Sequence, residues 1–364
     1  MAYKVIQVGT GGRGRSWCAS ILPPNIKDEL VEVVAAVDID PEVLIHAQEG
    51  LGVPADRCYT DMKKAFEENE ADFCTVVVPP AFHEDVVDMA LRHGMHILSE
   101  KPIADTLLSA CRIAEKVAQA GVKMGVTMSH RFDQDKTTLR EELRSGDHGV
   151  IDYVVGRHTN DMREFNDWGA VFRHQMVDPL MIEGAVHHLD IIADLIGSKC
   201  ETIFATTWNP QWGTYGGDSQ GLVTMSFESG AKATYEGAYT NAVGFNGWSK
   251  EYVRVECENT TLIMDHREVR RFRHQPEERV FSARENEGEV VPLLEQRKWT
   301  DAWLVEKFVH WLDGGEPMET NLEDNLQSVA LIFSAIESSR TGQPVNVQEF
   351  LQKTRVEARH SLAS

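Results

Sequence analysis

A glycine-rich turn near the start of the chain, VGTGGRG at residues 8–14, most constrains the fold. An apolar run, YKVIQV, precedes this turn, and a helical pattern, RSWCASIL, follows it. Gly9, Gly11 and Gly14 have G-x-G-x-x-G spacing. Between a strand and a helix, this spacing allows a tight turn, close approach of a pyrophosphate and close helix packing. The sequence therefore predicts a dinucleotide-binding turn, completed by Thr10 and Gly12.

Strand and helix patterns alternate through the first third of the chain. Further apolar runs are VEVVAAVDID, DFCTVVVPP, MHILSEKP and VKMGVTM, with helical patterns such as LLSACRIAEKVAQAG between them. The last helical pattern ends at Gly121, as a helix C-cap would. Continuous apolar strands separated by helices indicate a parallel sheet covered on both faces. We expect an α/β Rossmann domain over residues 1–125.

The pattern changes after about residue 126. A strand-like run, GVIDYVVGRHT, is followed by a strong helix at 177–196 and then by strand-like runs separated by turn residues. This order predicts an α+β domain with a large, mainly antiparallel open sheet. We assign residues 126–345 to this domain, for substrate binding and oligomerisation, and residues 346–364 to a C-terminal tail.

Charge and composition exclude several classes of partner. The formal net charge of -21 argues against a protein that binds nucleic-acid phosphates or an anionic membrane surface. The N-terminal segment lacks the order of a signal peptide, and no apolar run approaches the roughly 20 residues of a membrane span. The six cysteines are scattered, which favours free thiols. We expect a cytoplasmic protein with no nucleic-acid or membrane partner.

Asp38 ends the second apolar run at about the offset expected for a ribose-binding acid. A carboxylate there accepts hydrogen bonds from the adenosine ribose hydroxyls and repels a 2′-phosphate. Arg13 and Arg15 instead favour NADP, because either side chain could bind a 2′-phosphate. We expect NAD as the cofactor, with NADP the less favoured alternative.

Lys101 belongs to SEKP at residues 99–102, at the end of a predicted strand. Ligands of open α/β sheets bind beyond the carboxyl ends of the strands, so Lys101 is a candidate for the reaction site. The glycine motif, Asp38, VVVPPAFH, SEKP, the mixed second half and the closing helices together resemble the glucose–fructose oxidoreductase / inositol dehydrogenase (Gfo/Idh/MocA) family. The resemblance covers nearly the whole chain.

The resemblance implies a Rossmann domain, a second domain on an open sheet, and NAD(P) with a sugar or cyclitol in the cleft between them. Lys101 would help to polarise the reacting hydroxyl. Other positions that match the family around the cofactor are Pro79, Pro80, His83, Glu100 and Arg131. A homodimer or homotetramer through the open sheet face is also implied. We expect Val223, Met225 and Phe227 to make that face apolar.

The helix at 177–196 carries the second set of candidate residues. Glu183, His187, Asp190 and Asp194 fall within about 60° on a helix, so they form one polar stripe facing either solvent or a cleft. Neutral His187 suits the general base of alcohol oxidation, while Lys101 stabilises developing negative charge. Glu183 stands where the family has Asp, and we leave its role open between orienting His187, holding a substrate hydroxyl, and neither of these.

His188 lies about 100° around the helix from His187, and we expect it to be a packed histidine with a local hydrogen bond. Glu183 and His187 at i, i+4 spacing could also hold a metal ion. The sequence shows no obvious cluster to complete such a site, and the resemblance implies no metal, so we expect none. Further residues of mixed polar and aromatic character are candidate substrate contacts: His158, Arg163, Trp168, Arg173, His174 and Tyr239.

The leading hypothesis is an NAD-dependent dehydrogenase that oxidises a secondary hydroxyl of a sugar, cyclitol or related polyol, or reduces the ketone. The hydride would pass to nicotinamide C4. The alternative keeps the cofactor but oxidises the substrate only transiently, which gives glycoside cleavage or epimerisation. A nucleotide-bound sensor and a metal-dependent hydrolase are further hypotheses.

Overall fold

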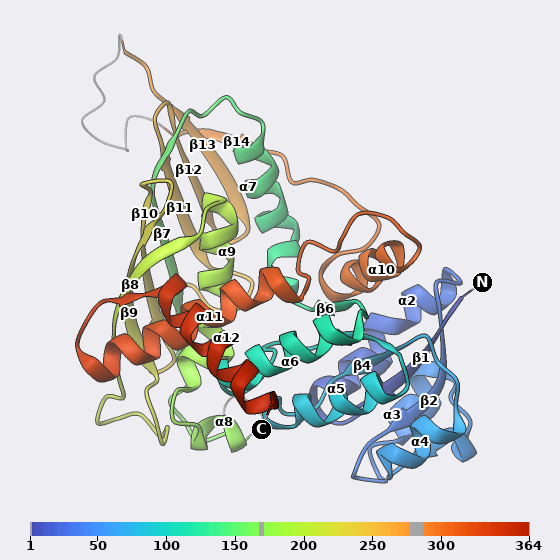
Figure 1. Cartoon of the computed structure of the whole chain (residues 1–364). Helices are drawn as coiled ribbons and strands as arrows, with labels where there is room; N and C mark the ends of the chain where they lie inside the picture. The colour runs from blue at the N-terminus through green and yellow to red at the C-terminus, as the bar shows by residue number, and fades with distance from the viewer. Residues whose placement is uncertain (1, 167–170, 277–286, 364) are drawn as a thin grey trace. The chain divides into compact units, whose positions relative to one another are not determined.

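The computed structural model describes residues 2–166, 171–276 and 287–363 (Figure 1). The chain forms two compact units. Unit 1 comprises residues 1–129, 298–329 and 352–364, and unit 2 comprises residues 130–297 and 330–351. Within the described part of the chain, no helix combines the length and the apolar character needed to cross a bilayer.

Unit 1 is built on a parallel sheet of six strands in the order β3-β2-β1-β4-β5-β6. The buried strands are short and apolar, such as β4 with the sequence FCTV. The strands are β1 (Tyr3–Val8), β2 (Val31–Val37), β3 (Cys58–Tyr59), β4 (Phe73–Val76), β5 (His96–Ser99) and β6 (Met124–Val126). This order and the parallel pairing confirm the predicted Rossmann domain.

Most of the helices of unit 1 connect its strands. The helical stretch after the glycine turn comprises α1 (Gly12–Ser16), a π-helical segment (Trp17–Ile21) and α2 (Leu22–Lys27). The others are α3 (Ile45–Leu51), α4 (Met62–Glu68), α5 (His83–Arg92), α6 (Leu107–Ala120) and α10 (Thr300–Leu312). The side chain of Thr106 caps the start of α6, and Gly121 ends it with φ +68°, as predicted.

Unit 2 contains a mixed sheet of nine strands in the order β14-β13-β12-β11-β7-β10-β9-β8-β15, in which β7 and β10 are the parallel pair. This arrangement confirms the predicted large, mainly antiparallel sheet. Its strands are β7 (Ile151–Thr159), β8 (Cys200–Trp208), β9 (Gln220–Phe227), β10 (Lys232–Ala238), β11 (Tyr252–Cys257), β12 (Thr260–Asp265), β13 (Glu268–Arg273), β14 (Glu289–Val291) and β15 (Val345–Asn346).

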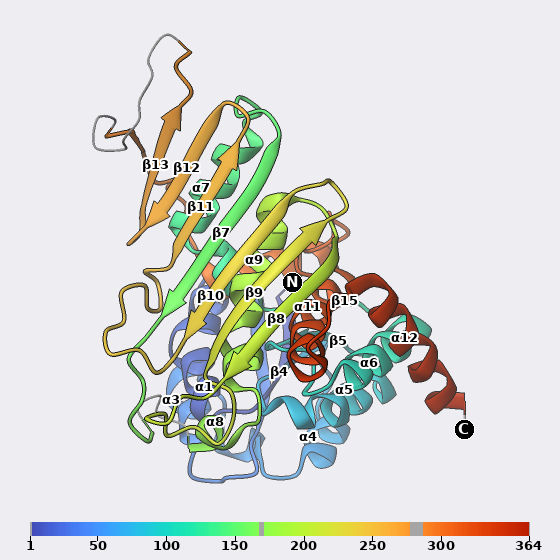
Figure 2. The same cartoon turned by 90° about the vertical axis from the view of Figure 1, so that its left-hand side faces the viewer.

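Two helices pack on one face of this sheet. They are α7 (Gln134–Arg144), which contacts β12 and β13, and α9 (Val186–Ile196), which contacts β7 and β10. Figure 2 looks onto the opposite face, with these helices behind the strands. A π-helical segment (Leu180–Ala185) leads directly into α9, so the helix predicted at 177–196 is real but begins with a wider turn. The short helix α8 (Val171–Gln175) lies before it in the chain.

The predicted open face of the sheet was assigned to the wrong residues. Val223, Met225 and Phe227 are at most 3% exposed, and Val223 pairs with Tyr235, which contacts α9. Alternation along a strand places the neighbouring residues on the other face. There Leu222 is 53% exposed and Phe204 40% exposed. The open face therefore carries a different set of apolar residues.

The predicted domains are continuous in sequence, whereas the two compact units are not. The second domain was assigned residues 126–345, but residues 298–329 belong to unit 1, where α10 packs on α2. The predicted tail at 346–364 is mostly the helix α12 (Val347–Ala363). The chain changes unit within α12 and within α11 (Leu322–Thr341), so the closing helices are shared by the two units.

Glu84 links α5 to α6 in unit 1. Its carboxylate accepts hydrogen bonds from Ser109 Oγ at 2.7 Å, Arg112 Nη2 at 2.6 Å and Lys116 Nζ at 2.9 Å. Burial raises the pKa of Glu84, but Arg112, Ser109 and Lys116 outweigh burial and lower the pKa to about 2. A depressed folded-state pKa stabilises the protein above the unfolded pKa, and the stabilisation is lost as pH falls through the folded value.

We expect Glu84→Gln to reduce the free energy of unfolding by about 1 kcal/mol near neutral pH, the upper end for accessible ion pairs. The difference from the wild type should shrink as pH falls below about 4.5 toward 2. Urea unfolding at several pH values measures this difference. Glu67→Gln, at an exposed pair with Lys63, should have little effect at any pH. If the difference in free energy of unfolding between Glu84→Gln and the wild type did not change with pH, the account would be contradicted.

Candidate functional site

The glycine turn of unit 1 has the geometry that its spacing predicts. Gly9 has φ +92°, and a Cβ there would lie 2.0 Å from the Val77 carbonyl oxygen. A Cβ on Gly14 would lie 2.4 Å from the Gly9 carbonyl oxygen. Gly11 differs, because its Cβ would meet only the Val43 side chain, at 3.5 Å. Gly9 and Gly14 are thus required by packing, whereas the space beside Gly11 is open to a ligand.

Asp38 lies at the end of β2 and contacts the glycine turn directly. Its Oδ2 accepts hydrogen bonds from the backbone N–H of Thr10 at 2.7 Å and of Gly11 at 3.1 Å. The carboxylate therefore fixes the turn and lies where a ribose-binding acid is expected beside it.

Arg13 and Glu100 form a polar network in unit 1. Arg13 Nε donates to Glu100 at 2.9 Å, and Arg13 Nη2 donates to Asp301 at 2.6 Å. Trp17 Nε1 also donates to Glu100, at 2.8 Å. Burial raises the pKa of Glu100, but Arg13 and Trp17 outweigh it and hold the pKa below its usual value. Because Arg13 already contacts two carboxylates, it supports binding of the NADP 2′-phosphate less strongly than the sequence suggested.

The residues predicted beside the cofactor lie at the ends of β4 and β5. Pro79 and Pro80 follow β4, and His83 begins α5. His83 is fully buried, with Nε2 2.8 Å from the Val78 carbonyl oxygen and Nδ1 3.0 Å from that of Ile103. Burial lowers the pKa of His83. These contacts give His83 a supporting role under the loop that carries Pro79 and Pro80.

Lys101 lies two residues after the end of β5, and its peptide bond to Pro102 is cis. The neighbouring Glu100 is buried, whereas Lys101 is partly exposed. The order of the parallel sheet places β5 next to β4, so Lys101 and the Pro79 loop lie at the same edge of the sheet. This edge is where ligands of open α/β sheets bind.

The polar stripe of α9 is buried within unit 2. Glu183 and His187 are each 5% exposed and Asp190 is 1% exposed. Asp190 accepts two hydrogen bonds from Arg131, at 2.6 and 2.7 Å, and Arg131 also lies 3.5 Å from Asp194. The stripe is therefore not a solvated edge, and Arg131 belongs to unit 2, where it forms ion pairs with two acids.

Glu183 has its own cationic partner, because Arg173 Nε donates to it at 2.9 Å. The adjacent Gly184 lies against Tyr239, and a Cβ on Gly184 would be 2.1 Å from the tyrosine oxygen. Burial raises the pKa of Tyr239, so this phenol is neutral. The lead-in to α9 thus brings Arg173, Glu183 and Tyr239 into one region of unit 2.

His187 and His188 lie in a cluster of stacked rings. His187 stacks on His130 with ring centroids 4.1 Å apart, and His188 stacks on His158 at 4.3 Å. His188 Nδ1 is 2.9 Å from the Tyr235 hydroxyl, which confirms that His188 is packed with a local hydrogen bond. The two neighbouring histidines therefore contact different partners, as the helical geometry predicts.

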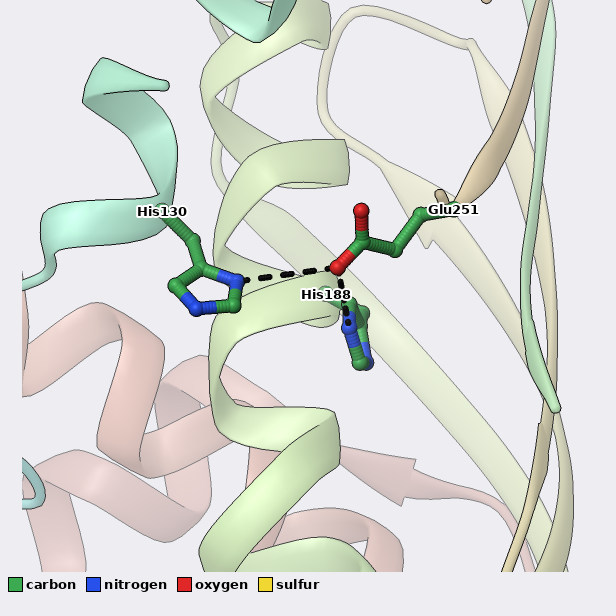
Figure 3. A group of neighbouring side chains, drawn as sticks. All are labelled: His130, His188 and Glu251. Carbon is green, nitrogen blue, oxygen red and sulfur yellow. Dashed lines mark ion pairs between the residues drawn. The ribbon is translucent and has the colours of Figure 1, made fainter. Parts of the chain in front are cut away.

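Three residues near these rings were missed at the sequence level: His130, Trp248 and Glu251. The ring of Trp248 lies 4.6 Å from His158 and 5.0 Å from His130. Glu251 Oε1 is 3.7 Å from His130 Nδ1 and 3.8 Å from His188 Nε2 (Figure 3). His130 and Trp248 belong to the polar and aromatic segments HRFDQD and GAYTNAVGFNGW, which only the fold brings together.

The other candidate substrate residues have varied surroundings. His174 stacks on Tyr215 at 4.3 Å, and Tyr215 stacks on Tyr239 at 5.9 Å, so these rings extend toward His158. Arg163 Nε donates to Asp161 at 2.9 Å. Trp168 lies outside the described residues. His158, Tyr239 and His174 are thus linked by ring contacts.

Comparison with known proteins matches the chain to two family models, one over each half of the sequence. A family model described as "Oxidoreductase family, NAD-binding Rossmann fold" (GFO_IDH_MocA) matches residues 3–128, and its companion "Oxidoreductase family, C-terminal alpha/beta domain" matches residues 140–347. The uncharacterized protein y4oX of Sinorhizobium fredii is 53% identical over 358 residues, which is 98% of this chain and 99% of that one.

More distant relatives carry descriptions of activity. A scyllo-inositol 2-dehydrogenase (NAD(+)) of Bacillus subtilis is 25% identical over 298 residues, 79% of this chain and 81% of that one. A crystal structure of an oxidoreductase from Agrobacterium radiobacter in complex with NAD+, L-tartaric acid and magnesium matches with a TM-score of 0.81 at 19% identity, covering 96% of this chain and 100% of that one. The chain therefore belongs to the Gfo/Idh/MocA family of oxidoreductases, with an NAD-binding Rossmann domain and the family's C-terminal alpha/beta domain.

Proposed function

We propose that this protein is an NAD-dependent dehydrogenase that oxidises a secondary hydroxyl of a sugar, cyclitol or related polyol. The observation that carries the proposal is the glycine turn, which is open beside Gly11 and held by the Asp38 carboxylate. The substrate class rests on family membership and on relatives such as the scyllo-inositol 2-dehydrogenase. When bound, the nicotinamide supplies the hydride acceptor.

The residues of unit 1 fit a dinucleotide. Gly12 follows the N-cap Gly11 and begins α1, whose N-terminus would offer N–H groups to a pyrophosphate. Thr10 and Gly11 position Asp38, whose second carboxylate oxygen accepts from the N–H of Asp40. We propose that this carboxylate accepts hydrogen bonds from the ribose hydroxyls and disfavours NADP by charge repulsion.

We expect Asp38→Asn to narrow the preference for NAD over NADP by about 10-fold or more, because one close charge repulsion is worth at least about 1.4 kcal/mol. The amide keeps one acceptor oxygen for the N–H groups of Thr10 and Gly11, so the turn should persist. Titration of the variant with each cofactor measures the change. Unchanged affinities for both cofactors would contradict the role of Asp38.

We propose that Lys101 and His187 handle the substrate hydroxyl. Lys101 would donate a hydrogen bond to the oxygen and stabilise its developing negative charge. His187 would accept the hydroxyl proton as a general base. Glu183, held by Arg173, would contact a substrate hydroxyl or fix the polarity around His187. Tyr239 and His158, which lie in the same unit, would line the substrate's position.

The direct test is a panel of sugars, cyclitols and other polyols with purified protein and NAD. Appearance of NADH absorbance with one stereochemical group of substrates supports the proposal. Substrate turnover with no net NADH would instead support the redox-neutral alternative, in which the substrate is oxidised only transiently. No turnover across the panel and no NAD binding would reject both activities.

Two further features of the protein are proposed on the same basis. The six free cysteines suit a reducing, cytoplasmic environment. The exposed apolar residues of the sheet face in unit 2, including Phe204, Trp208 and Leu222, support assembly as a homodimer or homotetramer. Light scattering at micromolar concentration tests the assembly.

A further inference from the structure

We propose that His130, His188 and Glu251 form a binding site in unit 2 for a divalent transition-metal ion of the zinc class. The three residues come from different parts of the chain: the turn before α7, the helix α9, and the segment that leads into β11. Figure 3 shows the two imidazole rings directed toward one carboxylate oxygen of Glu251. The site departs from the sequence-based expectation of no metal, and it uses neither Glu183 nor His187.

The spacing of the three ligand atoms fits a shared ion. His130 Nδ1 and His188 Nε2 lie 3.7 and 3.8 Å from Glu251 Oε1, and all three atoms lie within 4.8 Å of one another. These separations exceed the roughly 3.2 Å limit of a good hydrogen bond. Ligand atoms about 2.0–2.1 Å from a tetrahedral ion lie ~3.3 Å apart, so small side-chain shifts would close the site.

Other contacts orient the proposed ligands. His188 Nδ1 lies 2.9 Å from the Tyr235 hydroxyl, which leaves Nε2 directed toward Glu251. Metal-binding histidines commonly use the second ring nitrogen in this way, and the hydrogen bond fixes the tautomer and the ring plane. His158 stacks on the ring of His188, and His187 stacks on that of His130. The rings are therefore held in place before an ion binds.

The surrounding charges are suited to a cation. Glu251 Oε2 is 2.9 Å from Lys136 Nζ, which by itself would repel an ion. Lys136 also lies 2.9 Å from Asp133 and 3.8 Å from Asp135. One ammonium among three carboxylates leaves a formal charge of minus two, which matches a divalent cation. Because Glu251 and Lys136 are almost fully buried, this charge is poorly screened by water.

A small cavity adjoins two of the three proposed ligands, His188 and Glu251. The cavity has a volume of about 10 Å³ and is bordered by these two residues, by Lys136 and by residues of α9, β7 and β11, whereas His130 does not border it. This is about the smallest volume that holds one water molecule. His130 is 20% exposed at its side chain, so the site has an accessible side. An ion could therefore enter without unfolding of unit 2.

Two imidazoles and one carboxylate favour zinc and related ions over magnesium or calcium, which prefer oxygen ligands. Three protein ligands leave at least one coordination position for an oxygen ligand. His187 stacks directly on His130, so the proposed base lies beside the ion. A substrate hydroxyl is the oxygen ligand that fits. This last assignment rests on the proposed function, whereas binding of the ion does not.

The test uses the full-length protein, stripped with a chelator, desalted and titrated with Co²⁺ and Zn²⁺ in the absence of NAD and substrate. We expect about one ion per chain, with visible Co²⁺ absorption typical of nitrogen and oxygen ligands. His188→Ala and Glu251→Gln should each weaken Zn²⁺ affinity at least about 100-fold. Removing a ligand should cost at least as much as changing a residue that only hydrogen-bonds to a ligand, for which the upper value is about 100-fold. His130→Asn, at the partly exposed ligand, provides a variant with a smaller folding risk.

His148→Asn is the matched control, because His148 is 2% exposed in the same unit and lies outside the three ligands. Circular dichroism should show that each variant is folded. Loss of binding in the three ligand variants, with retention in the control, supports the site. Binding that is weaker than millimolar in the wild type, or unaffected by the ligand variants, overturns it.

NADH formation by the metal-free protein is the second measurement. Loss of activity that returns with Zn²⁺ or Co²⁺ supports the substrate-ligand role. Undiminished activity without metal would overturn that role but leave the binding result intact. Failure of the dehydrogenase proposal itself would be seen differently, as absence of activity in both metal-free and metal-loaded protein.

Discussion

Replacing Lys101 with Met should lower kcat by about 100- to 1,000-fold, the range for removal of one charge-stabilising donor. Methionine keeps the length of the side chain but removes the ammonium, so the variant tests charge rather than packing. The affinity for NAD should stay within about twofold, because the glycine turn and Asp38 make the proposed contacts to the nucleotide. Steady-state kinetics and calorimetric titration with NAD measure the two effects separately.

His187→Asn should reduce kcat by a comparable amount, since a general base contributes about 10²- to 10⁴-fold. The remaining activity should rise toward high pH, where hydroxide replaces the missing base. A merely structural role for His187 would leave the shape of the pH profile unchanged. The matched controls are Lys27→Met, at an exposed lysine of unit 1, and His148→Asn in unit 2. Wild-type kcat in both Lys101→Met and His187→Asn would refute the mechanism.

Substitutions in the glycine turn should give the second large effect. One of them should weaken cofactor binding without changing stability, and another should lower stability. Gly11→Ala should keep the melting temperature of the wild type, because its Cβ would meet only Val43 at 3.5 Å and the backbone φ of -82° suits alanine. The added methyl group would occupy the space proposed for the pyrophosphate. We expect NAD affinity to fall at least about 100-fold, or roughly 2.7 kcal/mol.

Gly14→Ala should have the opposite signature. Its Cβ would lie 2.4 Å from the Gly9 carbonyl oxygen, so the helix must move away from the turn. Overpacking of this kind costs about 1–3 kcal/mol, and we expect a melting temperature lower by several degrees. Thermal unfolding and NAD titration of the two variants, side by side, check the assignment. Equal melting temperatures and equal NAD affinities would show that the turn has no such role.

Unit 1 could be predicted in detail because its determinants are local. Gly9, Gly11 and Gly14 lie within one turn, and Asp38 follows the next strand, so spacing alone brings them together. The helix end at Gly121 was likewise readable from one residue. In unit 2, helical geometry was enough to separate His187 from His188, since neighbouring positions on a helix point in different directions.

Contacts between distant segments could not be predicted in the same way. Glu251 meets His188 only because β11 pairs with β7, and no local pattern specifies that register. The buried face of β9 was misassigned because alternation defines two faces without saying which one the helices cover. Local patterns also gave no sign that α10 packs in unit 1, to which the chain returns from far along the sequence. Each of these features is decided by tertiary packing.

The most direct test of the central claim follows hydrogen from substrate to cofactor. A polyol that is active in the panel, deuterated at the carbon to be oxidised, is incubated with the protein and NAD, and the products are analysed by mass spectrometry. The account predicts one deuterium per turnover at C4 of the accumulated NADH, with a ketone as the second product. Deuterium that stays in a cleaved or epimerised sugar, with no labelled NADH, would contradict net dehydrogenation.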